Sequence, residues 1–316
     1  MFIDIKEFLE IHDDPRFDKY TLRDVNPVSK HIKTREISNP NKSMREIHRR
    51  IIQAVKDVYL DSSNHFSSTH QNADRHNSSR FFYQTDLMHA YASVPLEGLV
   101  TILSSLKPTW GTKNVREILT TYCFDESGAG LIVGAPASPI LFNIYAWQTL
   151  DIPLLEFWPY MNDEGQIFRK FYTRYLDDLT FSSPEPITDS IRRSIRRVVE
   201  QAGFQINHRK STVRDLKKGP VVITGVGLEY RPRRSARLFL PRHYLKRMNG
   251  LLHLALKGDP RVSHSEIEGL MGVFYGVLGR KHRQSHQSTK LNATESRFLE
   301  MYGAYRAQYE RATNRK

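Results

Sequence analysis

The sequence has only one cysteine, Cys123, among its 316 residues. A single cysteine excludes an internal disulfide framework and a zinc site built from several thiolates. Long apolar runs are also missing, because no stretch approaches the roughly 20 residues that a membrane-spanning helix needs. The opening residues, MFIDIKEFLEIHDD, carry acids where a signal peptide has a basic and then an apolar segment. We therefore expect a cytoplasmic protein that has no membrane as a partner.

Acidic residues are few relative to basic ones: 34 Asp and Glu stand against 47 Lys and Arg, a net charge of +13. Thirteen basic and three acidic residues fall between His208 and Pro260. A solvated face alone poorly explains so much unbalanced charge, so this region is predicted to contact nucleic acid. The basic residues that we assign to this contact are Arg233, Arg234, Arg237, Arg242, Lys246 and Arg247.

Because repeats and low-complexity segments are also absent, the spacing of apolar residues sets the expected elements. Apolar residues at helical spacing predict a helix over 44–60, and the polar stretch 61–80 is predicted to be a loop. The other predicted elements are strands over 80–87, 168–175, 179–182 and 220–228, and helices over 95–106, 112–122, 187–203 and from 243 onward. The outline is a mixed α/β body followed by a helical tail that begins near residue 240.

Three aspartates are placed where predicted strands end. Asp86 closes the aromatic-rich strand, and Asp177 and Asp178 lie at the tip of a predicted hairpin. If these strands are neighbours, the carboxylates converge on one place, and magnesium prefers such hard oxygen ligands. Two divalent ions about 4 Å apart activate a 3′-hydroxyl and hold the leaving phosphates when a nucleotide is added. An Asp-Asp pair alone is weak evidence, since most such pairs are simply solvated.

Two further segments strengthen this interpretation through their order in the chain. Gly130–Pro139 is a glycine-rich turn, in which Ser138 is predicted to cap a helix that Pro139 opens. Gly203–Lys210 then places a lysine after the acidic hairpin. A carboxylate, a glycine loop, paired carboxylates and a lysine in this order are poorly explained by coincidence.

Together these motifs resemble those of reverse transcriptases, specifically the small bacterial retron type, over about residues 30–280. The resemblance implies an α+β fold with the right-hand arrangement of polymerases. Fingers are expected from residues 1–80 with an inserted segment at about 95–165. The palm, with an antiparallel sheet, is expected from 81–235, and a helical thumb and C-terminal tail from 236–316.

The resemblance also implies roles for individual residues. Asp86 and Asp177 match the two metal-ligand aspartates, and Asp178 matches the third catalytic acid. Leu87 would offer its backbone carbonyl to a metal, and Ser138 lies in the loop expected to contact the template. Tyr91 matches the residue that excludes a 2′-hydroxyl. The residues expected to bind the nucleotide are Lys33, Arg35, Tyr91, Ala135 and Lys210.

Two elements resemble retron enzymes in particular. Asn72-Ala-Asp-Arg-His76 matches an Asn-Ala-x-x-His element that precedes the first aspartate. Asn72 and His76 are expected to contact RNA or to satisfy each other within a loop. Ile223-Thr-Gly225 resembles a Val-Thr-Gly element with one conservative change. Either element alone is weak, but both occur in their expected places.

The glycine loop departs from the family pattern at two positions. The family has a glutamine before Gly-Ala-Pro that contacts the incoming nucleotide, and this chain has Val133 there. Ile132 also replaces a proline. The expected metal site is untouched by these changes. What selects the incoming nucleotide, however, is left open.

The implied activity is RNA-directed DNA synthesis with two Mg2+ ions, or with Mn2+ in their place. The implied partners are a cognate non-coding RNA, its DNA product, deoxynucleoside triphosphates and a separate effector protein in anti-phage defence. Two alternatives stay open. One is a defence-associated relative that makes repetitive or untemplated DNA, primed by a protein hydroxyl; the other is a catalytically silent RNA-binding scaffold. The intact set of acids argues against the scaffold.

Overall fold

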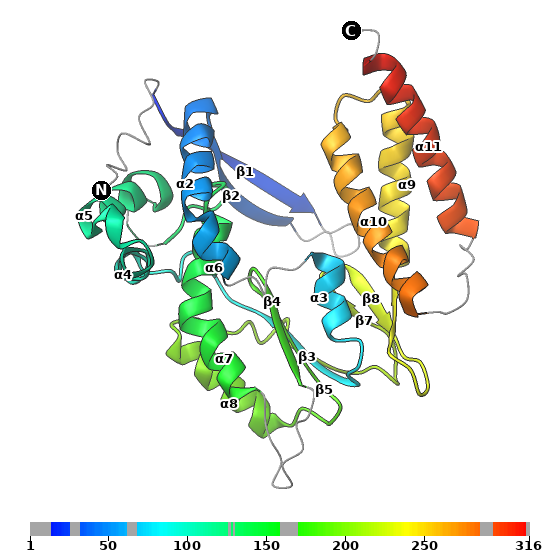
Figure 1. Cartoon of the computed structure of the whole chain (residues 1–316), viewed down its shortest axis with the longest axis horizontal. Coiled ribbons are helices and arrows are strands. Elements are labelled where there is room, and N and C mark those ends of the chain that lie inside the picture. Colours follow the sequence, from blue (N-terminus) through cyan, green and yellow to red (C-terminus); the bar gives the residue numbers. More distant parts are fainter. Residues whose placement is uncertain are drawn as a thin grey trace.

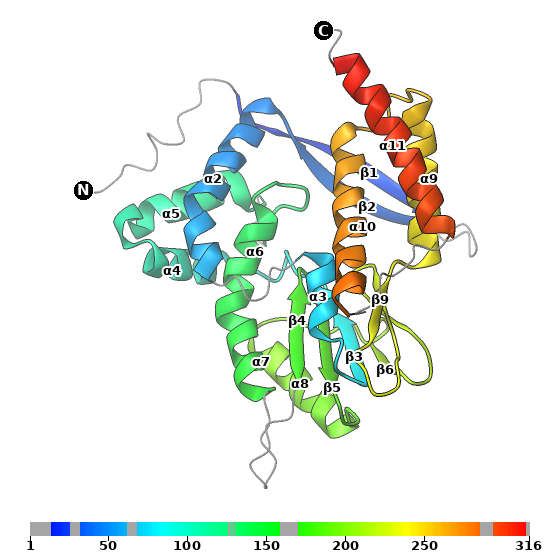
Figure 2. The same cartoon turned by 45° about the vertical axis from the view of Figure 1, so that its right-hand side comes forward.

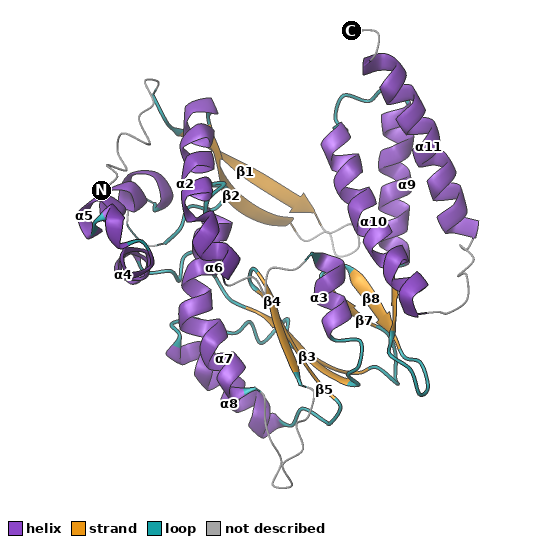
Figure 3. Ribbon diagram, in the orientation of Figure 1, coloured by secondary structure: helices purple, strands orange, loops and turns teal. Residues whose placement is uncertain are grey.

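The computed structural model describes residues 14–25, 32–61, 68–125, 128, 130–158, 170–284 and 293–313. Within them a mixed body of helices and strands leads into a bundle of three C-terminal helices (Figures 1 and 3). The strands form antiparallel sheets of two, four and three strands. The predicted combination of an α/β body and a helical tail is therefore confirmed. Among these residues, none of the helices has the length and apolar character that crossing a membrane requires.

The four-stranded sheet lies at the centre of the body in the order β4-β5-β3-β6. In β3 the aromatic residues Phe82 and Tyr83 are buried, which explains why this segment is extended and central. β3 pairs with β5 in a register that sets Asp86 opposite Asp178, so the predicted neighbourhood of the acid-bearing strands is confirmed. The strand bounds are Phe81–Asp86 (β3), Phe171–Tyr175 (β4), Asp178–Ser183 (β5) and Thr212–Asp215 (β6).

Three helices cover one face of this sheet (Figures 1 and 2). Tyr172 and Phe181 of the sheet stack with ring centroids 4.8 Å apart, and the Trp158 ring lies 5.2 Å from Phe181. These aromatic contacts bury large apolar areas and fix the helices against the strands. The helices are α6 (Ser138–Ala146), α7 (Ile152–Phe157) and α8 (Asp189–Gln201), and a π-helical segment, Trp147–Asp151, joins the first two.

A second unit of the body consists of a long hairpin and the helices beside it (Figure 2). The predicted helix near 44–60 is confirmed, and it buries Met44, Ile47, Ile51 and Val55 on one face. The elements are β1 (Phe17–Val25), β2 (Ile32–Pro40), α2 (Lys42–Asp61), α4 (Leu96–Leu106), the 3-10 turn Pro108–Trp110, α5 (Thr112–Ile118) and the π-helical Leu119–Cys123.

The polar stretch predicted to be a loop contains a short helix, α3 (Thr69–Arg75), so that prediction was wrong. The Gln71 side chain accepts a hydrogen bond from the Ser68 backbone N–H, which stabilises the helix start. Ala73 is fully buried, because α3 packs between the central sheet and the C-terminal bundle. Tertiary packing therefore gives this segment a helix that its composition does not indicate.

The segment predicted as one strand over 220–228 is a hairpin of two strands, so this prediction was also wrong. The chain reverses at Thr224 and Gly225, whose φ angles are 45° and 85°. Glycine adopts such angles without a steric penalty, which makes Gly225 suitable for the turn. The three-stranded sheet contains β7 (Val221–Ile223), β8 (Val226–Glu229) and β9 (Arg237–Phe239).

The C-terminal bundle packs on this small sheet and on α3 (Figure 1). The Ser263 Oγ accepts a hydrogen bond from the Glu266 N–H at 3.2 Å, which caps the start of α10. Gly276 allows α10 to approach α3 closely, since a Cβ there would lie 2.4 Å from the His70 ring. The helices are α9 (Arg242–Leu256), α10 (His264–Gln284) and α11 (Ala293–Thr313).

Candidate active site

The three predicted catalytic acids gather at one end of the central sheet. Asp86 is the last residue of β3 and is 5% exposed, whereas Asp177 and Asp178 are exposed at the β4–β5 turn. The Leu87 N–H donates to the Asp177 carbonyl at 2.9 Å, which ties the end of β3 to this turn. Leu176, just before the acids, has a φ of 53°. A non-glycine residue held in this left-handed region marks a constrained turn of the kind found at functional sites.

Lys210, which the family resemblance assigns to the nucleotide, lies in the same cluster as the acids. Its Nζ lies 2.7 Å from Asp86 Oδ2 and forms a salt bridge with it. The Asn207 N–H donates to the Asp86 carbonyl at 2.8 Å, and Leu87 bridges to Ile206. The segment 205–211 thus runs beside the acids because backbone hydrogen bonds hold it there.

Electrostatic repulsion is concentrated at this end of the sheet. Asp178 touches solvent, yet the protein atoms packed around it, together with the charges of Asp177 and Asp86, raise its pKa to about 6. The hydrogen bond to Asp86 also raises the pKa of Lys210, which favours the charged form of the lysine. Asp86 therefore pairs directly with the Lys210 ammonium group, while Asp177 and Asp178 act on it only through their nearby charges.

This charge imbalance fits a site for divalent cations. Within the described part of the chain, no three Asp, Glu, His or Cys side chains are already arranged around one metal position, and Asp86 instead faces Lys210. Carboxylates that repel each other become stable when a hard cation lies between them. The carboxylates of Asp86, Asp177 and Asp178 could serve as the oxygen donors for a divalent cation at this end of the sheet.

Tyr91 lies beside the acids at the edge of the glycine loop. Its ring packs edge-on against Phe142 of α6 with centroids 5.4 Å apart. Burial raises the Tyr91 pKa to about 12, and the nearby Asp177 charge contributes to this rise. The Leu131 N–H donates to the Tyr91 carbonyl at 3.0 Å, and Gly130 leaves no room for a Cβ against Ala92. The loop and Tyr91 are consequently fixed to each other.

The glycine loop also contacts the β1–β2 hairpin. The Ser38 N–H donates to the Val133 carbonyl at 3.1 Å, and a Cβ on Gly134 would lie 2.4 Å from the Ser38 carbonyl oxygen. The Val133 side chain is 50% exposed, so it faces solvent and not the core. Position 133, where the resemblance leads us to expect a glutamine, is thus an accessible position on the loop.

The remaining residues assigned to nucleotide and template vary in their placement. Lys33 and Arg35 lie on β2, but their side chains are outside the described residues. Ala135 is only 3% exposed. Ser138 is the first residue of α6, not the N-cap as predicted, because its Oγ donates to the Ile132 carbonyl at 2.7 Å and closes the loop.

Asn72 and His76 are buried within the protein, at 3% and 0% exposure. The two His76 ring nitrogens lie 2.7 Å from Ser182 Oγ and from Thr173 Oγ1, on two strands of the central sheet. The Asn72 Nδ2 donates to Thr224 Oγ1 at 3.4 Å. Both residues thus connect α3 to its neighbouring sheets, and their hydrogen bonds are made to protein groups.

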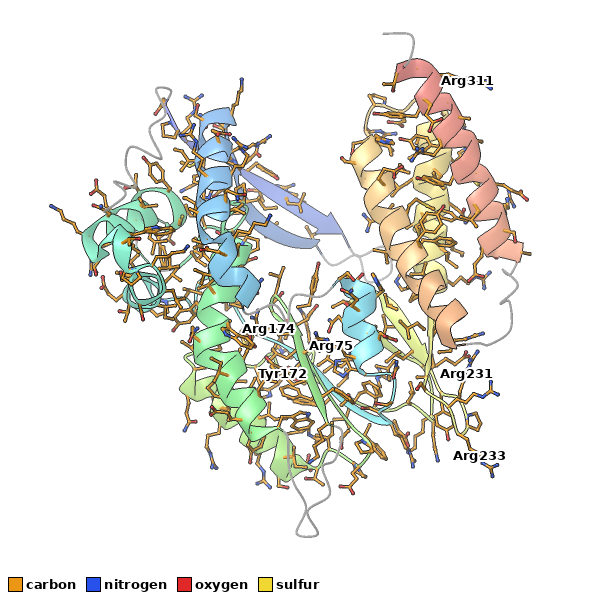
Figure 4. The ribbon with its side chains drawn as sticks, viewed as in Figure 1. Arg75, Tyr172, Arg174, Arg231, Arg233 and Arg311 are labelled. Atoms are coloured by element: carbon orange, nitrogen blue, oxygen red, sulfur yellow. The ribbon has the colours of Figure 1, made fainter. Side chains whose placement is uncertain are left out.

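The basic residues assigned to nucleic acid lie on the small sheet and on α9. Arg233 and Arg234 are exposed in the turn between β8 and β9, where Arg231 and Arg233 point outward (Figure 4). Arg237 differs from them, because its Nη2 lies 2.6 Å from Glu229 Oε2. Arg242, Lys246 and Arg247 are on α9, where they project from the first two turns of the helix. One group of these cations thus lies on the β8–β9 hairpin and the other on α9.

Arg174 and Asp151 form a buried ion pair that sequence reasoning missed. Both side chains are completely buried, and Arg174 Nη2 lies 2.6 Å from Asp151 Oδ2. The Tyr172 hydroxyl also donates to Asp151 at 2.7 Å. The signal in the sequence is an arginine in an aromatic-rich strand, FYTRY, since an arginine that is buried in such a strand requires a partner.

Because His76 is buried, we predict that it makes the free energy of unfolding depend on pH. Burial lowers the His76 pKa to about 3, so the folded protein keeps this ring neutral, while an unfolded chain protonates near 6.5. Stability is therefore retained above pH 6.5 and lost as pH falls, at about 1.4 kcal/mol per pH unit for each such histidine. We expect His76→Gln to reduce the slope of the unfolding free energy between about pH 6 and 4.5 by this amount in urea titrations.

His48, whose pKa burial lowers to about 4, contributes a similar slope, so the variant retains part of the pH dependence. Identical slopes for wild type and His76→Gln would contradict this assignment, whatever the absolute stabilities are.

The antiparallel sheet that bears the acids, the adjoining glycine loop and the C-terminal helical bundle agree with the right-hand polymerase fold that the sequence resemblance implies. The family model "Reverse transcriptase (RNA-dependent DNA polymerase)" matches residues 28–228, which is more than half of the chain. The chain belongs to the reverse transcriptase family.

Curated relatives point to one branch of the family. The Retron Ec83 reverse transcriptase of Escherichia coli is 30% identical over 166 residues, 48% of this chain and 49% of that protein. The Retron Mx65 reverse transcriptase of Myxococcus xanthus is 29% identical over 145 residues, 44% of this chain and 30% of that protein. The matches thus span half or less of these relatives' length.

Among solved structures, telomerase from Candida albicans in complex with a telomeric RNA fragment matches with a TM-score of 0.49 and 12% identity. This match covers 90% of this chain and 55% of the telomerase. The corresponding Candida tropicalis complex matches with a TM-score of 0.45 and 11% identity over 95% of this chain and 60% of that one.

Proposed function

We propose that the protein is an RNA-directed DNA polymerase of the retron type, which copies part of a cognate non-coding RNA into DNA. The observation that carries the proposal is the pairing of Asp86 with Asp178 beside Asp177, at the end of the sheet that the glycine loop and Lys210 adjoin. The family membership and the retron relatives support the same activity. A role in anti-phage defence, with a separate effector protein, rests on the retron resemblance.

In this proposal the residues of the right hand have separate tasks. The central sheet forms the palm (81–235), the β1–β2 hairpin and residues 1–80 and 95–165 form the fingers, and residues 236–316 form the thumb and tail. The loop from Gly130 to Ser138 supports the nucleotide, and Tyr91 closes the space next to its sugar. Both elements are fixed to each other by the backbone hydrogen bond between Leu131 and Tyr91, so the pocket is preorganised.

The acids and Lys210 supply the electrostatics of the reaction. Asp86, Asp177 and Asp178, with the Leu87 carbonyl, would hold two Mg2+ ions, which activate the 3′-oxygen and neutralise the leaving phosphates. The Lys210 ammonium, which pairs with Asp86 at 2.7 Å, would lie close enough to the acids to neutralise charge on the leaving pyrophosphate. Lys33 and Arg35 would hold the triphosphate from the fingers, where a point charge and a planar fork suit phosphate oxygens.

The exposed Val133 supports a second candidate: DNA synthesis without strict templating. At this position an aliphatic side chain replaces a glutamine and offers no hydrogen bond to a nucleotide. Sequencing the nucleic acid that co-purifies with the protein separates the two candidates. DNA that is complementary to a defined segment of the bound RNA supports retron-type copying, whereas repetitive DNA without an RNA counterpart supports the second candidate.

Arg233 and Arg234 make a testable contribution to RNA binding. Each phosphate contact that is lost reduces the slope of log K against log salt by about 0.7–0.9. We therefore expect the double variant Arg233→Ala/Arg234→Ala to bind RNA more weakly and with a slope smaller by about 1.5, measured by filter binding at several salt concentrations.

The control for this experiment is Arg49→Ala, because the Arg49 guanidinium on α2 is already paired with Glu46. Equal salt slopes for the double variant and wild type would remove these two arginines from the RNA-binding surface.

A further inference from the structure

One cation, Arg174, connects the acidic turn to the helix that follows the glycine loop. Its Nη1 donates to Asn143 Oδ1 on α6 at 2.6 Å and to the Leu176 carbonyl at 3.1 Å. Leu176 directly precedes Asp177, and its φ of 53° places it in the constrained part of the turn. The same nitrogen thus holds the turn on one side and α6 on the other.

The orientation of the guanidinium is fixed by Asp151. Arg174 Nε lies 2.9 Å from Asp151 Oδ1 and Nη2 lies 2.6 Å from Oδ2, which is the bidentate arrangement that a carboxylate favours. Tyr172, two residues earlier on the same strand, donates its hydroxyl to Asp151. Burial, together with the negative charge of Asp151, raises the Tyr172 pKa well above its ordinary value, so the phenol keeps its proton and remains a donor.

The connection extends to the residue beside the nucleotide loop. Phe142, next to Asn143, lies under the guanidinium with 5.2 Å between Arg174 Cζ and the ring centroid. The Phe142 ring also packs against Tyr91 at 5.4 Å. A continuous series of contacts therefore runs from the acidic turn through Arg174 and Phe142 to Tyr91.

A contribution to folding stability does not by itself explain the buried pair of Arg174 and Asp151. A buried ion pair often contributes no more to folding than apolar side chains of equal volume, because both charges lose their hydration. Its strength is in geometry, since several directional hydrogen bonds converge on one rigid planar group. The contacts of Arg174 join the turn that bears Asp177 to α6, the helix that follows the glycine loop.

We propose that Arg174, held by Asp151, is a positioning residue that fixes Asp177 relative to α6 and the nucleotide loop. The proposal rests on the proposed polymerase function and extends it to residues that touch neither metal nor nucleotide. Misplacing reacting groups by about 1 Å can lower rates about 100-fold, so breaking the link between turn and helix has a large expected effect.

The test compares two substitutions at Asn143 that differ in one property. Asn143→Leu keeps the shape of the side chain but removes the acceptor, whereas Asn143→Asp keeps an acceptor oxygen for Arg174. We expect Asn143→Leu to lower kcat for deoxynucleotide addition about 10- to 100-fold. Its KM for the nucleotide should change by less than about threefold, because the loss falls on the transition state. Asn143→Asp is expected to restore most of kcat.

A matched pair of arginine variants controls for the loss of an ion pair as such. Arg80 also forms a bidentate pair, with Asp215 at 3.0 and 2.8 Å, but it lies at the opposite end of β3 from Asp86. Arg174→Lys is expected to lower kcat as Asn143→Leu does, and Arg80→Lys to leave it unchanged. Circular dichroism and melting curves ensure that all rates are compared at temperatures where each variant is folded.

Binding of Mn2+ alone, followed by electron paramagnetic resonance of the free ion, separates this inference from the proposed function. We expect Asn143→Leu to weaken Mn2+ binding several-fold and Arg80→Lys to leave it unchanged. If Asn143→Leu lowers only the melting temperature, with kcat and Mn2+ affinity as in wild type, the positioning role is overturned. If wild type binds Mn2+ but adds no nucleotide, the polymerase proposal fails, and the Mn2+ affinities still decide the role of Arg174.

Discussion

Replacing Asp177 with asparagine is expected to abolish deoxynucleotide addition, with a loss of about a thousandfold or more. Metal ions stabilise developing charge in phosphoryl transfer by several kcal/mol, and each 1.36 kcal/mol corresponds to about a factor of ten in rate. The asparagine side chain would keep the shape of the aspartate but lose the charge that holds a divalent ion. Because Asp177 is exposed at the turn, its replacement should leave the fold intact. The measurement is single-turnover primer extension in Mg2+.

The matched control for this charge change is Glu200→Gln, since Glu200 is an exposed acid on α8, outside the acidic cluster. This variant is expected to extend primers at the wild-type rate. An Asp177→Asn protein that is as active as Glu200→Gln would show that the chemistry takes place elsewhere.

Tyr91→Ala is expected to weaken discrimination against ribonucleotides by about 10- to 200-fold, the range over which a pocket rejects a slightly larger group. The physical reason is steric: the ring occupies space next to Asp177 and is held there by Phe142. Tyr91→Phe keeps the ring and should retain the selectivity of wild type. The measurement is the ratio of kcat/KM for a deoxynucleotide to that for the matching ribonucleotide.

If the ratio for Tyr91→Ala equals that for Tyr91→Phe and for wild type, the tyrosine does not form the sugar pocket. An equal loss of activity with both nucleotides, at an unchanged ratio, would assign the ring a structural role only.

The acid-bearing strands could be predicted from the sequence because their signals are local. Aromatic residues favour an extended β3, and a short apolar run on each side of Asp177 favours a hairpin. Only the pairing of β3 with β5 is long-range, and the three acids suggested it before the register of Asp86 with Asp178 confirmed it. The resemblance pointed to Lys210 as a nucleotide-binding residue, but its contact with Asp86 at 2.7 Å is seen only in the structure.

Features that depend on tertiary packing could not be predicted in this way. The segment around α3 is polar enough to be a loop, and it is helical because Ala73 and His76 are enclosed between two sheets and the bundle. The turn at Thr224 divides an apolar run that otherwise favours one strand. Arg174 and Asp151 are 23 residues apart and carry no motif, so only the fold reveals that they are partners.

The most direct test of the central claim is primer extension by the purified chain on an RNA template annealed to a short DNA primer. The predicted result is DNA whose sequence is complementary to the RNA, made only when Mg2+ or Mn2+ is present, and lost in Asp86→Asn and Asp177→Asn. The contradicting result is no extension by the wild-type chain, or extension that persists in both aspartate variants.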